Sequence, residues 1–273
     1  MPEGPEIRIA ADKLDRAVGS SVATEVFFAF GHLKPYEKQM RGRRIAAVEP
    51  RGKALLIRFD NELSIYSHNQ LYGRWVIRKA YDYPATNRQL RLAIHNEKRS
   101  ALLYSASDIE VLDPSQLVSH PFLSTLGPDV LSDGVERVLH QLRSNQHRRR
   151  RFSSLFLDQH FIAGIGNYLR SEILFVAGLH PWLRPMDCST DELRVLADAA
   201  VAVAWQSYRH NGVTNDLERA GVLRAQGQTR SQYRHWVFGR GHQPCRLCDA
   251  SIVEDTAASR RIFFCPACQS GPG

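Results

Sequence analysis

The sequence predicts an α+β protein with an N-terminal helix, an antiparallel β-sandwich, a linker, a helical domain and a C-terminal four-cysteine β-hairpin. Three observations carry this prediction. Apolar residues recur at helical spacing after the opening residues, short β-rich runs follow, and two C-x-x-C pairs close the chain. With 273 residues and 43% hydrophobic content, the chain has room for two domains with cores of their own.

The first helix is predicted from the spacing of its apolar residues. The residues that share one helical face are Ile7, Ala10, Ala11, Leu14, Ala17 and Val18. Gly19 follows as a stop signal, and Pro5 suits the first turn, where its missing N–H costs nothing.

Eight β-rich runs separated by turn residues predict the sandwich. Their ranges are 22–30, 45–49, 55–59, 63–67, 74–78, 90–95, 101–104 and 109–112. Short strands at this spacing are typical of an antiparallel sandwich. We therefore expect an N-terminal domain over residues 1–120.

The second half of the chain is predicted to be helical. Segment 121–134, with Pro121, Gly127, Pro128 and Gly134, is expected to be a linker. Helices are predicted at 135–143, 152–161, 168–177 and 190–208, whereas 209–234, rich in Gly, Arg and Gln, is assigned no regular structure and is interpreted as a mobile loop. The expected division is a helical domain at 135–235 and a four-cysteine domain at 236–273.

The basic residues indicate a polyanionic partner. The formal charge is +8, all six lysines precede residue 100, and the later basic residues are arginine or histidine. Five arginines lie within 143–151, and five more lie within 219–240 with no acidic residue among those five. Guanidinium groups match phosphate oxygens, so these residues are typical of a surface that follows a nucleic-acid backbone. Solvated faces of a protein from an arginine-favouring genome are the alternative.

The sequence offers no apolar stretch long enough for a membrane span and no signal-peptide layout. We expect a cytoplasmic protein. Five cysteines in such a protein argue against a disulfide framework.

The opening Met1-Pro2-Glu3-Gly4-Pro5-Glu6 can deliver a nucleophilic amine. Removal of Met1 would leave Pro2 with a free secondary amine. An α-amino group has a pKa of roughly 8 against roughly 10.4 for lysine, so it is deprotonated far more often near neutral pH. It can attack a carbonyl carbon to give an iminium, with the Glu3 carboxyl beside it to move protons. An ordinary N-terminus, in which Pro5 opens a helix, is the alternative.

The C-terminal cysteines have the spacing of a zinc site. Cys245 and Cys248, then Cys265 and Cys268, enclose sixteen residues, as in four-thiolate zinc ribbons. Such a site has no open position, so one zinc ion would be structural and its binding energy would be folding energy. Redox dithiols are the competing interpretation, and Cys188 is left over as an ordinary thiol.

These motifs together resemble one family. The opening hexapeptide, Arg51-Gly52-Lys53, the run 66–73 (YSHNQLYG), the run 164–170 (GIGNYLR) and the four cysteines resemble the formamidopyrimidine-DNA glycosylase and endonuclease VIII family, in its order and over nearly the whole chain. The His-Asn-Gln-Leu-Tyr run is more similar to the endonuclease VIII branch, which removes oxidised pyrimidines.

The resemblance implies roles for residues that local pattern alone leaves open. Lys53 would approach the sugar and phosphate of the lesion, and His68 would lie near the active site, although a solvated turn lysine and a satisfied sheet histidine are the alternatives. Gln70, Leu71 and Tyr72 would fill the void left by a flipped base, unless Leu71 and Tyr72 are core strand residues.

Two phosphate contacts follow from the same resemblance. Asn167, in a helix-two-turn-helix motif, and Arg260, at a hairpin tip, would bind phosphates beside the flipped nucleotide. From the residues alone, Asn167 is an N-cap before free helix-start amides, which can bind an anion, and Arg260 or Arg261 is an exposed turn arginine.

The function implied is that of a monomeric bifunctional DNA glycosylase and AP lyase acting on oxidised, chiefly pyrimidine, bases in double-stranded DNA. Pro2 would be the nucleophile, Glu3 the general acid, and Lys53 would assist. One alternative is an oxidised-purine enzyme of the sister branch. Another is a zinc-ribbon protein that binds lesions without catalysis.

Overall fold

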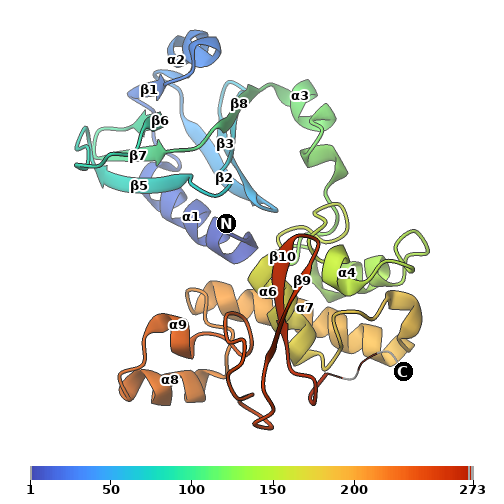
Figure 1. Cartoon of the computed structure of the whole chain (residues 1–273). Helices are drawn as coiled ribbons and strands as arrows, with labels where there is room; N and C mark the ends of the chain where they lie inside the picture. Colours follow the sequence, from blue (N-terminus) through green and yellow to red (C-terminus); the bar gives the residue numbers. More distant parts are fainter. Residues whose placement is uncertain (1, 270, 272–273) are drawn as a thin grey trace. The chain divides into compact units, whose positions relative to one another are not determined.

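A computed structural model describes residues 2–269 and residue 271 (Figure 1). The chain forms two compact units that meet in sequence between Thr125 and Leu126, inside the predicted linker. Unit 1 holds Pro2 and Glu6–Thr125, and unit 2 holds Glu3–Pro5 and the chain from Leu126 onward. Glu3 therefore belongs to unit 2 although it lies at the start of the chain. The finer four-part division stays a prediction.

Unit 1 contains the predicted antiparallel sandwich. One sheet has the order β1-β6-β7-β5 and the other β2-β3-β4-β8, and all the pairs are antiparallel. The strands are β1 (Glu25–Phe28), β2 (Ile45–Arg51), β3 (Ala54–Phe59), β4 (Ser64–His68), β5 (Arg74–Lys79), β6 (Leu90–His95), β7 (Arg99–Tyr104) and β8 (Asp108–Leu112). Each matches a predicted run, most of them to within a few residues.

The core of unit 1 follows the alternation of β-strand side chains. Leu55 and Ile57 of β3 point into the main core with α1 (Gly4–Val18), while Leu56 points to the opposite face. There it packs under the segment that contains α3 (Pro114–Ser119). β3 is therefore covered on both faces.

Two short helices of unit 1 were missed by the sequence analysis. The expected strand 22–30 ends at Phe28, and a 3₁₀ turn (Gly31–Leu33) leads into α2 (Lys34–Met40), which has Pro35 in its first turn. α3 begins after Asp113, whose side chain accepts the Gln116 N–H in a capping box. Both helices carry local start signals that the β-rich surroundings concealed.

Unit 2 is helical, with a terminal hairpin. Its helices are α4 (Gly134–Leu142), α5 (Phe152–Leu155), α6 (Asn167–Val176), α7 (Thr190–Arg209), α8 (Leu217–Ala225) and α9 (Arg230–Tyr233). α5 is shorter than predicted: after Leu155 the N–H groups of Leu157 and Asp158 donate to the third residue back, Ser154 O and Leu155 O, so the chain turns tightly and the α-helix ends. The 209–234 segment is not a structureless loop: Asp216 caps α8, and Thr229 starts α9 in a capping box.

The hairpin of β9 (Val253–Ala257) and β10 (Arg260–Phe264) turns through Ala258 and Ser259. Both turn residues have positive φ, 50° and 58°, as a two-residue turn that matches the strand twist requires. Within the part of the chain that the structure describes, no helix is long and apolar enough to cross a membrane.

Candidate active site and metal centre

Glu3 is held at the start of α6. Its side chain is 3% exposed and accepts backbone N–H groups of Gly166 at 2.7 Å, Tyr168 at 2.8 Å and Leu169 at 3.2 Å. A carboxylate is well placed at a helix N-terminus, because the N–H groups and the helix dipole point at it. A Cβ on Gly166 would lie 2.4 Å from Glu3 Cδ, so any other residue there would displace the Glu3 carboxyl group. Glu3 is thereby oriented by groups that lie far away in sequence.

This arrangement corrects the expected anion site. Asn167 is the first residue of α6 rather than its N-cap, which is Gly166. The amides of Gly166, Tyr168 and Leu169 are not free for a phosphate, because the carboxylate of Glu3 already occupies them. The sequence could not show this, since Glu3 is 163 residues away from Gly166.

Pro2 is half-buried and is covalently next to Glu3. Gly4 N–H donates to Gly164 O at 2.8 Å, which fixes the backbone just after this pair. A Cβ on Gly4 would approach Gly164 Cα at 3.1 Å, so the two glycines allow a close backbone crossing. Met1, whose removal would expose the Pro2 amine, lies outside the described residues.

Arg170 connects Asn167 to the hairpin and was not assigned a role from the sequence. It is fully buried, and its Nη2 donates to Asn167 Oδ1 at 2.7 Å and to Arg261 O at 3.1 Å. Its Nη1 donates to Ser153 O and reaches Ala257 O at 3.4 Å. Burial lowers the pKa of Arg170 to about 10, so it keeps its charge near neutral pH. The side chain thus fixes the hairpin turn against α6.

The two arginines at the hairpin turn differ in their contacts. Arg261 forms an ion pair with Glu254 at 3.2 Å and lies 5.7 Å from the ring of Phe263. Arg260 is exposed, and its backbone carbonyl is one of the groups that Arg170 approaches. Arg260 therefore presents its guanidinium to solvent from an anchored backbone.

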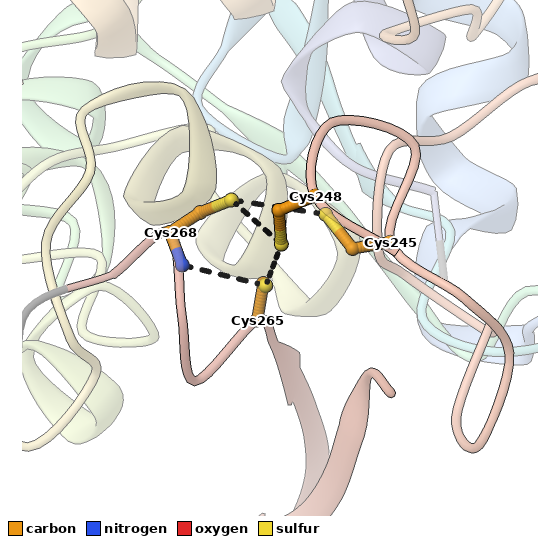
Figure 2. A group of neighbouring side chains, drawn as sticks. All are labelled: Cys245, Cys248, Cys265 and Cys268. Carbon is orange, nitrogen blue, oxygen red and sulfur yellow. Dashed lines mark hydrogen bonds between the residues drawn. The ribbon is translucent and has the colours of Figure 1, made fainter. Parts of the chain in front are cut away.

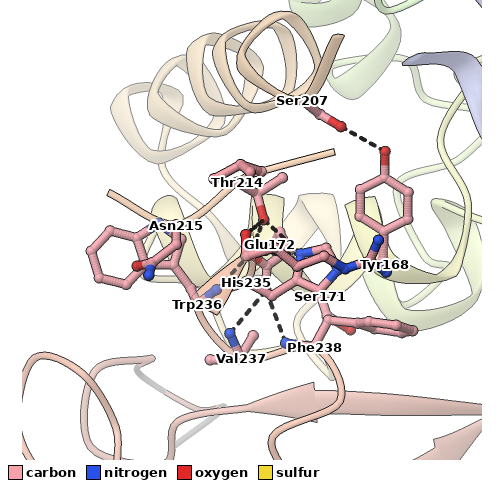
Figure 3. Close-up of polar contacts among 12 residues, drawn as sticks. Tyr168, Ser171, Glu172, Ser207, Thr214, Asn215, His235, Trp236, Val237 and Phe238 are labelled. Atoms are coloured by element: carbon pink, nitrogen blue, oxygen red, sulfur yellow. Dashed lines mark hydrogen bonds and ion pairs between the residues drawn. The ribbon is translucent and has the colours of Figure 1, made fainter. Parts of the chain in front are cut away.

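Glu172 is a second buried ionisable group that sequence reasoning missed (Figure 3), and burial raises the pKa of its carboxyl. It accepts backbone N–H groups of Trp236 at 2.8 Å, Val237 at 2.9 Å and Phe238 at 2.9 Å, and also the Thr214 hydroxyl. These bonds attach the segment before the first cysteine pair to α6. Its backbone partners lie more than 60 residues away in sequence, so local pattern carried no signal of this role.

Lys53 and His68 lie in unit 1. Lys53 is 8% exposed and follows Gly52, whose φ of 58° makes the tight turn between β2 and β3. His68 ends β4 opposite Asp108, with 3.8 Å between Nδ1 and Oδ2. Burial lowers the pKa of His68, the Lys53 charge adds to this, and Asp108 opposes it. The imidazole is thus biased toward its neutral form beside a lysine.

Gln70, Leu71 and Tyr72 form the connection between β4 and β5, called here the 70–72 loop. Leu71 is 61% exposed and Tyr72 is 70% exposed. The alternative that they are core strand residues is therefore wrong. Both side chains are therefore available for contact with a partner.

The arginine run at 148–151 is a surface feature with a fixed backbone. Arg150 pairs with Asp158 at 2.6 Å, Arg151 lies 5.8 Å from the ring of Trp182, and Arg148 O accepts the Met186 N–H. Arg148 and Arg149 are exposed.

The four cysteine sulfurs of unit 2 gather in one cluster (Figure 2). Sγ separations are 3.5 Å between Cys248 and Cys265, 3.4 Å between Cys248 and Cys268, and 3.8 Å between Cys245 and Cys268. Sulfurs about 2.3 Å from a tetrahedral zinc lie about 3.8 Å apart, whereas a disulfide needs about 2.0 Å. Backbone N–H groups also donate to Cys245 and Cys265 sulfurs. The donor set and its spacing fit one structural zinc ion.

Comparison with known proteins gives the same family as the sequence motifs. The profile of the Formamidopyrimidine-DNA glycosylase N-terminal domain matches residues 1–107, and that of the Formamidopyrimidine-DNA glycosylase H2TH domain matches residues 126–217. A Lactococcus lactis Fpg complex with DNA and an inhibitor has a TM-score of 0.81 at 18% identity, over 99% of this chain and all of that one. A MutM complex with DNA that contains carbocyclic 8-oxo-G has a TM-score of 0.80, also at 18%. At this identity, the structures establish a shared fold.

Sequence relatives cover the full length. Endonuclease 8 of Escherichia coli is 44% identical over 271 residues, which is 98% of this chain and 100% of that protein. Endonuclease 8 proteins of Salmonella arizonae and Klebsiella pneumoniae have the same identity and coverage. The chain belongs to the formamidopyrimidine-DNA glycosylase and endonuclease VIII family, on the endonuclease VIII branch.

Proposed function

We propose that the chain is a bifunctional DNA glycosylase and AP lyase of base excision repair, acting on oxidised bases, chiefly pyrimidines. The observation that carries the proposal is the full-length match to Endonuclease 8 proteins, together with an intact Pro2-Glu3 pair whose carboxylate is fixed on α6. A protein that only binds lesions would need neither the amine nor the oriented acid. The MutM structure with 8-oxo-G in its DNA shares 18% identity with the chain, against 44% for Endonuclease 8, which favours the pyrimidine branch.

Pro2 acts as the nucleophile once Met1 has been removed. Its nitrogen lone pair bonds to C1′ of the flipped nucleotide, the glycosidic bond breaks, and the base leaves with a proton. The sugar ring opens to an iminium, which acidifies C2′. Loss of the C2′ proton expels the 3′ phosphate, and a second elimination expels the 5′ phosphate. The product is a one-nucleotide gap with phosphate ends.

Glu3 supplies and removes protons in these steps. As general acid it protonates the sugar oxygen while the ring opens, and it later moves protons at the neighbouring carbons. Three backbone bonds hold the carboxylate in one orientation. This orientation is its structural contribution, because proton transfer needs a fixed donor–acceptor geometry.

Lys53, His68, Asn167 and Arg260 hold the lesion strand. Lys53 assists at the sugar and phosphate, and the lowered pKa of His68 suits a hydrogen-bonding imidazole beside that lysine. Asn167 and Arg260 contact the flanking phosphates. The buried Arg170 supports both roles, because it donates to Asn167 Oδ1 and approaches the backbone carbonyl of Arg260. The exposure of Arg260, against the ion pair of Arg261, supports Arg260 as the phosphate ligand.

The 70–72 loop fills the void that the flipped base leaves. Unstacking a base costs a few kcal/mol, and an inserted side chain offsets part of this cost. The four cysteines would hold a zinc ion that stabilises the hairpin carrying Arg260, with no part in the reaction. We place the enzyme in the cytoplasm, because its substrate, chromosomal DNA, is there. We propose that it acts as a monomer.

The substrate assignment is tested by product analysis. Duplexes with thymine glycol or with 8-oxoguanine are incubated with the protein, and the ends are resolved on a denaturing gel. We expect faster excision of thymine glycol, with phosphate at both ends of the gap. Faster excision of 8-oxoguanine would show an oxidised-purine preference. Absence of cleavage on both duplexes would indicate a protein that binds lesions without catalysis.

A further inference from the structure

Two loops of unit 1 and the C-terminal end of a third lie at the same end of the sandwich. The strand registers place Arg74 of β5 and Leu90 of β6 beside Tyr104 of β7, and His68 of β4 beside Asp108 of β8. The connections that start or end at these residues are 69–73, 80–89 and 105–107. The 70–72 loop is therefore adjacent to two other loops.

Side chains of these neighbours bond to the 70–72 loop on both sides of Leu71. Ser107 Oγ donates to Gln70 Oε1 at 2.8 Å, and Arg88 Nη1 donates to Tyr72 O at 2.7 Å. The neighbours are also joined to each other, since Ser105 N–H donates to Gln89 O at 2.8 Å. Leu71 itself is 61% exposed, so its position depends on its flanking residues.

The backbone of the loop is one that needs outside support. Gln70 has a φ of 49°, in the left-handed region that costs a side-chain-bearing residue free energy. Such a conformation persists when surrounding contacts hold it. Gly73 N–H closes the turn onto Asn69 O at 2.7 Å, and a Cβ on Gly73 would lie 2.5 Å from that oxygen.

A loop that is ordered before binding loses less conformational entropy when it inserts into a duplex. We propose that Ser107 and Arg88 are positioning residues that hold the 70–72 loop in its inserting shape, and so set the activity on lesions within paired DNA. The inference rests on the proposed void-filling role of this loop. Neither residue needs to touch the reacting atoms.

The test compares two substrates for Ser107→Ala, Arg88→Ala and the double variant. Loss of one hydrogen bond should lower kcat/KM on a duplex thymine glycol by about two- to tenfold, and the double variant should lose more. Activity on a duplex with a preformed abasic site, where flipping is easier, should change less than about twofold. Equal losses on both substrates would overturn the inference and indicate general destabilisation.

Matched controls separate the contacts of Arg88 and Ser107 from the loss of a positive charge and from the loss of a side chain. Arg78→Ala removes the same charge from the exposed side of β5 and should leave the substrate ratio unchanged. Ser107→Thr keeps a hydroxyl and should restore the ratio. A loss for Arg78→Ala as large as for Arg88→Ala would mean that only net charge matters.

A double-mutant cycle with Leu71→Ala shows whether the two residues act through the loop. If they do, adding Ser107→Ala or Arg88→Ala to Leu71→Ala should cost little more on the duplex lesion. Fully multiplicative losses would overturn the inference. If Leu71→Ala alone leaves duplex activity intact, the void-filling role fails as well. If Leu71→Ala is impaired but the Ser107 and Arg88 variants are not, only this inference fails.

Discussion

The start of α6 and the 70–72 loop are built in opposite ways. At α6, charged groups are buried and hydrogen-bonded: Glu3 accepts three backbone N–H groups, and Arg170 donates to Asn167 and to a hairpin carbonyl. In the 70–72 loop, Leu71 and Tyr72 are exposed, and the polar contacts are made by the Gln70 side chain and the Tyr72 backbone.

This contrast teaches which part of the activity each region serves. Buried charges with several bonds are fixed in one geometry, which suits proton transfer and phosphate binding. An exposed leucine and tyrosine have unfavourable contact with water, which insertion into a duplex would remove. The first region should therefore control chemistry, and the second should control access to the base.

Removal of zinc should have the largest effect, because it unfolds the hairpin whose carbonyl Arg170 binds at the start of α6. Zinc binding contributes on the order of 10 kcal/mol to folding of such segments. Chelation should abolish DNA binding while the β-sandwich of unit 1 keeps its circular dichroism signal, and elemental analysis should give about one zinc per chain. An apo protein with full affinity for DNA would contradict the zinc assignment.

Glu3→Gln should come next. It removes the general acid and places an amide N–H₂ against backbone donors, so release of an intact damaged base should fall by about 100-fold or more. Strand cleavage at a preformed abasic site should keep much of its rate, because base departure is already complete. Glu6→Gln, the same change on α1, is the control. Equal losses on both substrates would show that Glu3 is only structural.

Leu71→Ala should have a smaller effect that falls on the second region only. Activity on a duplex lesion should drop by about tenfold, since the inserted side chain no longer offsets the cost of unstacking. The abasic substrate should be affected far less, and the melting temperature should not change, because Leu71 is exposed. A lowered melting temperature, with equal losses of activity on both substrates, would show that Leu71 serves stability rather than base flipping.

The smallest effect concerns the arginine run. Replacing Arg148 and Arg149 by serine should reduce the slope of log K against log salt for undamaged duplex by up to about 2, because each phosphate that an arginine neutralises adds about 0.9 to that slope. Lys38→Ser with Arg41→Ser, at the end of α2, is the control with the same charge change. An unchanged slope would mean that Arg148 and Arg149 are merely solvated.

The sequence predicted the elements whose signals lie within a short stretch of the chain. The eight strands, α1, α4, α6, α7 and the hairpin follow from periodicity and turn residues, and the cysteine cluster follows from spacing. α8 and α9 were missed because Gly, Arg and Gln obscure their caps, although Asp216 and Thr229 are ordinary start signals. The family resemblance added roles that no spacing contains.

The buried charges could not be predicted, since their partners are backbone groups far along the chain. Glu3 binds amides near residue 166, and Arg170 binds carbonyls near residue 260. Backbone groups have no sequence signature, so only the folded structure shows where such charges are neutralised. Glu172 is a further example.

The central claim is that the Pro2 amine forms a covalent iminium with the lesion sugar, and hydride trapping tests it most directly. Protein lacking Met1 is mixed with duplex thymine glycol and borohydride, and the cross-linked peptide is mapped by mass spectrometry. We predict that the DNA is attached to Pro2, and that retaining Met1 or adding an N-terminal tag abolishes the product, because either turns the amine into an amide. Attachment at Lys53, or undiminished trapping with a blocked N-terminus, would contradict the claim.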